Sequence, residues 1–278
     1  MVSLLSRLLV VGALVGAGFT STYADTNRLD ITGSSTVAPV IADIAKQFEQ
    51  AHPGTRIDVQ TGGSSRGISD ARTGRADIGM VSRALHENEG DLKAYPFAMD
   101  GIAIITHASN PVKTLDREEI IAIFIGQITN WQQLGGTDQP VTVVNKAEGR
   151  STLELFLAYF KLSNSDIKPH VVIGDNQQGI KTVAGNRGAI GYVSIGTAEF
   201  EAGYGTPIQL MPLSGVAPTT AHVADGSFPL SRQLNLVTVG EANGLAAQFI
   251  EYAQSEASHK LIQEHFFVPL KSQASEQP

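Results

Sequence analysis

Cysteine does not occur anywhere in this sequence of 278 residues. Its absence excludes disulfide bonds, thiol nucleophiles, thiolate metal ligands and lipid attachment through cysteine. A chain without disulfides is stabilised by its apolar core, and this chain is long enough to form two compact lobes. Basic residues are the minority, and the net charge is −7. A nucleic-acid partner is therefore not expected, although a few local cations can still bind a small anion.

Long apolar runs are also scarce. The only one lies at residues 8–19. It is shorter than the roughly 20 residues that cross a membrane. Arg7 precedes it and the small residues of Thr22-Tyr23-Ala24 follow it, which is typical of a signal peptide. We expect residues 1–24 to be this signal peptide and the mature chain to be a soluble protein of the periplasm, with secretion as an alternative.

Clusters rich in Gly, Ser and Thr occur at three points where a strand-like run passes into a helix-like segment. They are GSST at 33–36, GGSS at 62–65 and GRST at 149–152. The first N–H groups of a helix have no partner inside the helix, and the helix dipole is positive there. Such turns bind anions. Three of them in one chain predict convergence on a single anionic ligand.

Strand-like and helix-like segments alternate through the first 160 residues, which predicts βαβ units and a mainly parallel sheet. The expected strands are 29–32, 57–59, 77–81, 101–106, 141–144, 188–193 and 234–239. The expected helices are 37–48, 114–125, 153–160 and 245–253. The stretch 204–231 is rich in Gly, Pro, Ser and Thr and is expected to be a return connection between lobes.

From about residue 29 to 270 the chain resembles the periplasmic phosphate-binding proteins of phosphate ABC transporters. The resemblance is carried by ITGSSTVAP (31–39), GGSSRGI (62–68), ADIGMVSR (76–83), IFIGQITNWQQLGG (123–136), GAIGYVS (188–194) and FPLSRQLNLVT (228–238). It implies an α/β type II periplasmic binding protein fold. On this resemblance each of the two lobes would have a mainly parallel sheet flanked by helices, and a two-segment hinge would join them.

The resemblance also implies the limits of the lobes. Lobe I would comprise residues 25–108 and 227–278, and lobe II residues 109–226. The chain would cross between them near 106–111 and 225–232. The implied function is to capture inorganic phosphate in the cleft and deliver it to the membrane permease of an ABC transporter. A monomer without enzymatic activity, cofactor or metal is expected, and a phosphate scavenger or sensor outside transport is an alternative.

The ligand-binding residues implied by the resemblance come from four places in the chain. They are Ser34, Ser35, Thr36 and the amide of Val37; Ser64 and Ser65; Ser82 and Arg83; and Lys146, Arg150, Ser151 and Thr152. Hydroxyls and helix-start N–H groups supply donors, and an arginine can add a fork of two hydrogen bonds. We expect at least one arginine over the anion.

Three of these positions depart from the family pattern. Arg83 follows Ser82 where many members have aspartate, Arg150 replaces a small residue, and Lys146 stands where arginine is common. A carboxylate can accept the proton of a protonated phosphate, which sulfate cannot offer, whereas arginine is never an acceptor. Phosphate is the first choice of ligand, and sulfate, molybdate or a phosphorylated small molecule are the alternatives.

Other interpretations of the same residues stay open. Ser and Thr before a helix are ordinarily N-caps, worth about 1 kcal/mol each. Arg83 could pair with Glu87 or Glu89, Arg66 could face solvent, and Trp131 could serve packing alone. Gly63-Ser64-Ser65-Arg66-Gly67 also fits the G-x-S-x-G motif of serine hydrolases. Ser65 would then need Asp175 or Asp225 and His259 or His265 as triad partners.

Overall fold

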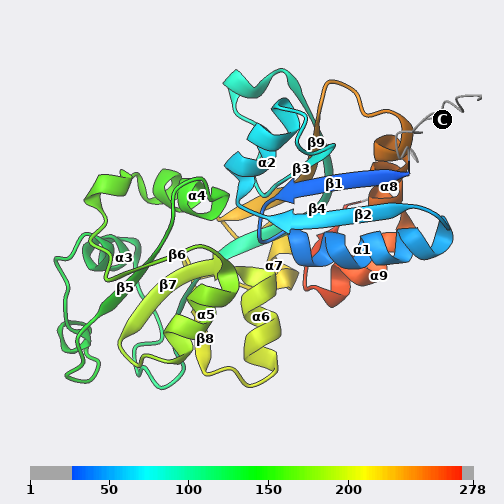
Figure 1. Ribbon diagram of the computed structural model, residues 1–278. Helices are drawn as coiled ribbons and strands as arrows, with labels where there is room; N and C mark the ends of the chain where they lie inside the picture. The colour runs from blue at the N-terminus through cyan, green and yellow to red at the C-terminus, as the bar shows by residue number, and fades with distance from the viewer. Residues whose placement is uncertain (1–26, 271–278) are drawn as a thin grey trace, which may run out of the picture.

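The computed structural model describes residues 27–270, so the predicted signal peptide lies outside the described residues. The described chain folds into two α/β lobes that lie side by side and are joined by two strands, β4 (Leu92–His107) and β9 (Ser231–Val239) (Figure 1). No helix of the described residues is long and apolar enough to cross a membrane.

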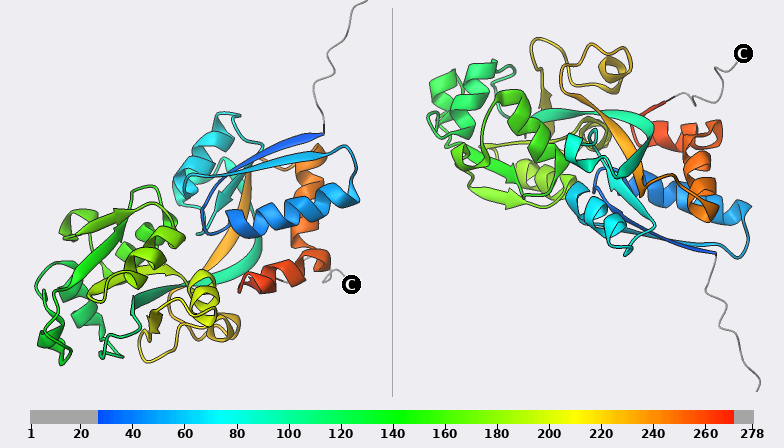
Figure 2. Two further views of the ribbon diagram at one scale, coloured as in Figure 1. Left: turned by 60° about the horizontal axis from the view of Figure 1, so that its bottom comes forward. Right: turned by 90° about the horizontal axis from the view of Figure 1, so that it is seen from above.

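The first lobe is built on three parallel strands, with β1 (Arg28–Gly33) between β2 (Arg56–Thr61) and β3 (Ile78–Val81). Strand β9 pairs antiparallel with β3, and β10 (Val268–Pro269) pairs antiparallel with β4. The helices of this lobe are α1 (Ala38–Ala51), α2 (Ser64–Arg72), α8 (Gly244–Gln254) and α9 (Glu256–Glu264). Helices α1, α8 and α9 gather together in both views of Figure 2.

Helix α1 illustrates how the sequence dictates these elements. Ile41, Ile44 and Phe48 recur at helical spacing and are buried against the sheet. A proline is tolerated in the first turn because the N–H groups there have no partner within the helix. The helix ends at Ala51, just before Pro53-Gly54.

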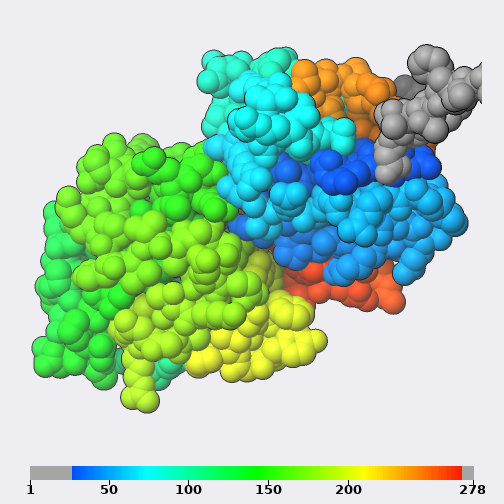
Figure 3. All heavy atoms as spheres, in the orientation of Figure 1, coloured from blue at the N-terminus to red at the C-terminus, as the bar shows by residue number. Residues whose placement is uncertain are grey.

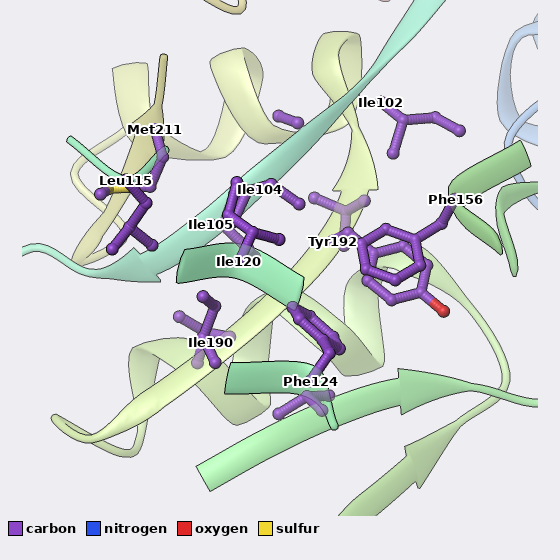
Figure 4. Packing of buried hydrophobic residues seen from close by; sticks show 14 of the residues in the cluster. Ile102, Ile104, Ile105, Leu115, Ile120, Phe124, Phe156, Ile190, Tyr192 and Met211 are labelled. Carbon is purple, nitrogen blue, oxygen red and sulfur yellow. The ribbon is translucent and has the colours of Figure 1, made fainter. Parts of the chain in front are cut away.

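The second lobe contains parallel strands β5 (Thr142–Lys146), β6 (Val171–Ile173) and β7 (Ala189–Ser194), with β8 (Ile208–Met211) antiparallel to β4. Its helices are α3 (Arg117–Phe124), α4 (Ser151–Phe160), α5 (Asn176–Ala184), α6 (Ile195–Gly203) and α7 (Thr220–Ala224). Figure 4 shows its core, where the rings of Phe156 and Tyr192 stack with centroids 4.0 Å apart. The stretch 204–231, which was expected to be a return connection, contains the strand β8 and the helix α7.

Strand β4 belongs to both lobes. It pairs antiparallel with β9 from Leu92 to Gly101 and then, from Ile102, with β7 and β8. The hydrogen-bonded order β2-β1-β3-β9-β4-β7-β5-β6 thus runs through the whole molecule. The two crossing strands make both sheets mixed rather than simply parallel.

The first passage between lobes lies earlier in the chain than predicted. The resemblance implies a crossing near residues 106–111. In the structure the strand changes neighbours at Gly101–Ile102 without any break in its own conformation. Ile102–Ile105 already pack in the core of the second lobe. A change of sheet inside a continuous strand leaves no composition signal, which explains the difference.

Candidate functional site

A narrow pocket lies between the two lobes, where the clusters at the ends of β1, β2 and β5 meet. Its lining comes from both lobes and consists of Ser34, Ser35, Thr36, Gly63, Ser64, Ser82, Lys146, Arg150, Ser151, Thr152 and Gly174. Figure 3 shows the lobes touching where the segment around α4 meets the segment around α2. The lining contains no acidic side chain. All three Gly-, Ser- and Thr-rich clusters therefore converge on one place, as predicted.

The helices that begin at this pocket have no side-chain cap. Neither α1, α2 nor α4 has a cap hydrogen bond from its N-cap side chain. Elsewhere in the second lobe α3, α5, α6 and α7 are each capped by an Asp, Ser or Thr side chain. Helices α8 and α9 also lack a cap, but they begin away from the pocket. Of the cluster hydroxyls only Ser34 Oγ accepts a cap-like hydrogen bond, from the N–H of Thr36 at 3.2 Å. The N-cap interpretation therefore does not account for the other hydroxyls of the clusters.

The start of α4 presents several polar groups without partners. The backbone N–H groups of Ser151 and Thr152 form no hydrogen bond to another described residue. The Oγ atom of Ser151 is buried and has no hydrogen-bond partner within the described chain. A buried polar group without a partner is costly. These donors are therefore suited to a ligand in the pocket.

Arg232 on β9 lies behind the pocket and was not predicted as a site residue. It is 4% exposed, and its Nε and Nη2 atoms donate to Oδ2 of Asp100 at 3.0 and 2.8 Å. The remaining hydrogen bonds of its guanidinium go to the hydroxyls of Thr152 (2.9 Å), Thr36 (3.2 Å) and Ser82 (3.4 Å). Arg232 lies in FPLSRQLNLVT, one of the motifs that carry the family resemblance. Its partner Asp100 is 132 residues away in sequence, so no local pattern indicates that the two pair.

These contacts orient the hydroxyls. Thr36 Oγ1 accepts hydrogen bonds from Arg232 and from Nδ2 of Asn176 at 3.1 Å, and Ser82 Oγ accepts from Arg232 and from Ser34 at 3.0 Å. A hydroxyl has two lone pairs and one proton. With both lone pairs engaged, the protons of Thr36 and Ser82 remain for donation. The pocket is thus preorganised as a set of donors.

Lys146 at the end of β5 is 3% exposed, and its Nζ atom donates to Oδ1 of Asn176 at 2.7 Å. Burial above all, with the charges of Arg232 and Arg150 and against an opposing effect of Asp175, lowers the pKa of Lys146 to about 7. No carboxylate forms an ion pair with Lys146 in the described chain. An anion in the pocket would supply the missing counter-charge.

Arg150 is the N-cap residue of α4 and lies across Gly63 of the other lobe. A Cβ atom at Gly63 would come within 2.8 Å of Cδ of Arg150, and Gly63 has a φ of +96°. Glycine is therefore needed there for both space and backbone conformation. Within the described chain the guanidinium of Arg150 forms no hydrogen bond or ion pair, so its donors are free to meet a ligand.

Arg83, one of the expected ligand-binding residues, pairs with two carboxylates and does not line the pocket. It is 4% exposed and lies beside the pocket, outside its lining. Its Nη1 and Nη2 atoms donate to both oxygens of Glu89 at 2.8 and 2.9 Å, and its Nε donates to Oε2 of Glu154 at 2.7 Å. The alternative pairing with Glu89 is therefore the one that the structure shows. The N–H donors that Arg83 would need for a ligand are therefore engaged by the carboxylates of Glu89 and Glu154.

Val37 and Ser65 also lie outside the pocket lining. The side chain of Val37 is fully buried in the core of the first lobe, whereas its backbone N–H, the group expected at the ligand, has no hydrogen-bond partner within the described chain. Ser65 is exposed; its N–H donates to the carbonyl of Gly149 at 3.3 Å, and its Oγ to Glu154 at 3.5 Å. On α2 it is Ser64 that faces the pocket, because successive helical residues point in directions about 100° apart. The remaining nine predicted site residues all line the pocket.

The packing interpretation of Trp131 is confirmed. Trp131 is buried, and its indole N–H donates to the carbonyl of Gly188 at 2.9 Å. The carboxylate of Asp77 accepts from the N–H of Asp30 at 2.8 Å. Arg66 is half exposed and pairs with Asp70.

The hydrolase alternative lacks its triad. Ser65 forms no hydrogen bond to a histidine of the described chain. Asp175 caps α5, Asp225 accepts from Ser227, and His265 pairs with Asp43. The described residues also contain no cluster of three or more His, Asp or Glu that could hold a metal ion.

Comparison with known proteins gives matches over most of the chain. A family model described as the PBP superfamily domain matches residues 20–257. The phosphate-binding protein PstS of Bacillus subtilis is 32% identical over 247 residues, covering 87% of this chain and 80% of that protein.

Solved structures agree with these matches. A crystal structure from Clostridium perfringens, described as a phosphate ABC transporter substrate-binding protein with bound phosphate, is similar with a TM-score of 0.81 and 32% identity. It covers 88% of this chain and 100% of that one. An ABC-type phosphate transport receptor from Vibrio cholerae has a TM-score of 0.72 and 33% identity, covering 86% of this chain and 99% of that one.

Proposed function

The chain belongs to the PBP superfamily and, within it, to the PstS family of phosphate-binding proteins, and on that premise we propose how it works. It binds inorganic phosphate in the pocket between its lobes and passes it to an ABC transporter. The relatives that support this assignment are themselves named for phosphate binding and phosphate transport.

One observation carries the proposal. The pocket gathers three uncapped helix N-termini together with Lys146 and Arg150, has Arg232 directly behind it, and has no acidic side chain in its lining. A fold gains nothing from concentrating cations and unpartnered donors in a buried place, because each such group costs free energy there. The arrangement becomes favourable when a small multivalent anion fills it.

The donors are suited to a tetrahedral oxyanion. Hydrogen bonds to a charged group contribute about 1.5–3 kcal/mol each, and such bonds must replace the hydration shell of the anion. Hydroxyls and backbone N–H groups add donors without adding further charge that would have to be desolvated. The guanidinium of Arg150 can contact two oxygens at once. Because Arg232 and Asn176 already orient the hydroxyl of Thr36, little order has to be created on binding.

We infer that the lobes open and close around this ligand, since donors from both lobes face the same pocket. We place the boundary between the moving parts at the change of sheet in β4, near Gly101–Ile102, and at Leu230–Ser231 on the returning segment. On this proposal the protein acts in the periplasm as a monomer, without catalytic turnover, and docks on the membrane permease of the transporter.

A ligand panel on protein freed of bound ligand tests the binding proposal. Phosphate at 100 times its dissociation constant should stabilise the protein by about 2.7 kcal/mol, seen as a rise in Tm. Sulfate, molybdate, arsenate and a phosphonate are measured in parallel, with calorimetric titration for each ligand that raises Tm. A rise with sulfate or molybdate but not phosphate would contradict the phosphate assignment while leaving the anion site intact.

Uptake measurements test the transport step. Cells that lack their own phosphate-binding protein but retain the permease should regain uptake of labelled phosphate when this protein is supplied. The Arg150→Ala variant serves as the control, because it retains the fold and loses a donor of the pocket. Normal binding without restored uptake would favour a scavenger or sensor.

A further inference from the structure

We propose that Lys146 distinguishes oxyanions that carry a proton from those that do not, because its Nζ atom can accept the proton of the bound ligand. The proposal deepens the phosphate function above and rests on it. It concerns phosphate and arsenate on one side and sulfate and molybdate on the other.

The inference starts from a missing acceptor. No carboxylate lines the pocket. Glu89 and Glu154 beside it are engaged with Arg83, and Asp100 behind it is engaged with Arg232. The hydroxyls of Thr36 and Ser82 have their lone pairs filled by Arg232 and other donors, so they can only donate to a ligand. The acceptors that remain for a P–OH group are hydroxyl oxygens such as that of Ser151, which are not basic, and the amine of Lys146 when it is neutral.

Lys146 is the basic group of the lining that can take that proton, because the other basic residue there, Arg150, is never an acceptor. Its side chain is buried, and its Nζ has one hydrogen-bond partner, the amide oxygen of Asn176. A charged ammonium has three donors and no acceptor, whereas a neutral amine has a lone pair. Two guanidiniums and no contacting carboxylate surround Lys146, and this environment favours the neutral amine near neutral pH.

The charged and titratable groups around Lys146 come from every element packed against it. Arg232 on β9 and Arg150 at the start of α4 disfavour its charged form, and Asp175 at the start of α5 favours it. Asp100 on β4 is bound to Arg232. Tyr192 on β7 accepts from the backbone N–H of Lys146 and donates to Asn145, and burial raises its pKa, so it stays neutral.

The proton balance then differs between the two classes of ligand. Hydrogen phosphate brings its own proton, which is shared between the phosphate oxygen and the amine, or moves to Nζ and leaves the phosphate with one further negative charge. No other reactant is needed. Sulfate brings no proton, so the neutral amine of Lys146 must take one from solvent to become the ammonium that pairs with the bound ion. Binding of sulfate is therefore linked to proton uptake wherever Lys146 is neutral in the free protein.

The consequence is a selectivity that depends on pH. At pH values above the pKa of Lys146, the affinity for sulfate should fall about tenfold per pH unit, since one proton is taken up per ion bound. The affinity for phosphate should stay nearly constant from about pH 7 to about pH 9, because the ligand supplies the proton. The preference for phosphate over sulfate should therefore grow as the pH rises.

Calorimetric titrations of phosphate, arsenate, sulfate and molybdate across this pH range test the proposal, in buffers of different ionisation enthalpy so that proton uptake is measured directly. Lys146→Arg keeps the charge at every pH and should make the sulfate profile as flat as that of phosphate. Lys146→Met removes the acceptor and should weaken all four ligands. Tm and unfolding curves confirm that each variant is folded.

Ser151→Ala is the matched control, because the Oγ atom of Ser151 is buried in the pocket lining and has no hydrogen-bond partner within the described chain. It should weaken both ligand classes and keep the difference between their pH profiles. Parallel profiles for phosphate and sulfate in the wild-type protein, or loss of the difference in Ser151→Ala alone, would overturn the role of Lys146. Failure of phosphate to bind at any pH would instead refute the proposed function.

Discussion

Arg83 and Glu154 join the two lobes beside the ligand pocket, with 2.7 Å between Nε of the arginine and Oε2 of the glutamate. Arg83 follows β3 in the first lobe and is fixed there by Glu89, whereas Glu154 lies in the first turn of α4 in the second lobe. His86 Nε2 lies 3.4 Å from the same carboxylate oxygen. The contact therefore holds the start of α4, and with it Ser151 and Thr152, against the first lobe.

The first prediction concerns this contact. Glu154→Gln should raise the dissociation constant for phosphate about fivefold, mainly through faster dissociation, because a partly exposed charged hydrogen bond between the lobes is weakened. The ratio of phosphate to sulfate affinity should not change, since Glu154 does not line the pocket. Stopped-flow measurement gives both rates. Glu118→Gln on α3 is the control for loss of an exposed carboxylate, and an unchanged dissociation rate in Glu154→Gln would disprove the role of the contact.

The second prediction concerns Arg150. Arg150→Ala should weaken the binding of every oxyanion by roughly 30-fold or more, because it removes charge-assisted hydrogen bonds worth about 2 kcal/mol or more to the ligand. Stability without ligand should be unchanged or higher, since the guanidinium has no partner within the described chain. Calorimetric titration measures the affinities. Arg187→Ala, an exposed arginine of the same lobe, should leave them unaltered; equal affinities for Arg150→Ala and wild type would remove Arg150 from the site.

The third prediction concerns the buried pair of Asp100 and Arg232, which are both almost inaccessible to solvent. Asp100→Asn leaves the charge of Arg232 uncompensated and should lower the free energy of unfolding by about 3–5 kcal/mol. Phosphate should recover part of this loss, because its own charge lies close to Arg232. Urea unfolding with and without phosphate measures both effects. Asp91→Asn, at an exposed pair with Arg72, should change stability far less, and a similar small change in Asp100→Asn would contradict the prediction.

Much of this architecture could be predicted from local patterns. The runs before Gly33, Gly62 and Gly149 are strands, or end close to one, and Ser34, Thr36, Ser64 and Thr152 do meet in one pocket. Such turns are encoded by neighbouring residues, because strand, glycine and helix start follow one another directly. The order of the motifs along the chain then indicated the two-lobed fold through the family resemblance.

The contacts between distant segments could not be predicted in the same way. Whether Arg83 faces the ligand or Glu154 depends on the separation of the lobes, which no stretch of sequence encodes. Arg232 acts through a carboxylate on another strand, and Ser64 rather than Ser65 faces the pocket because of the exact rotation of α2. Long-range partners and helix rotation are set by packing of the whole molecule.

The fourth prediction concerns stability and Lys146. In the unfolded chain this lysine has its ordinary pKa of 10.5, and in the folded protein without ligand burial lowers the pKa to about 7. Between these values the unfolded state binds more protons, so the free energy of unfolding should rise with pH, by up to about 1.4 kcal/mol per pH unit. Below pH 7 both states are protonated, and the penalty for the buried charge is then fully present.

Lys146→Met has no group to titrate at this position. Its stability relative to wild type should therefore be greatest near pH 6 and should shrink steadily as the pH rises toward 10. Urea unfolding in phosphate-free buffer at several pH values measures the difference, and Lys181→Met on the surface helix α5 should show no such trend. If the curves of Lys146→Met and wild type ran parallel across this range, Lys146 would have to be charged in the folded protein throughout, and burial among Arg150 and Arg232 would not control its proton.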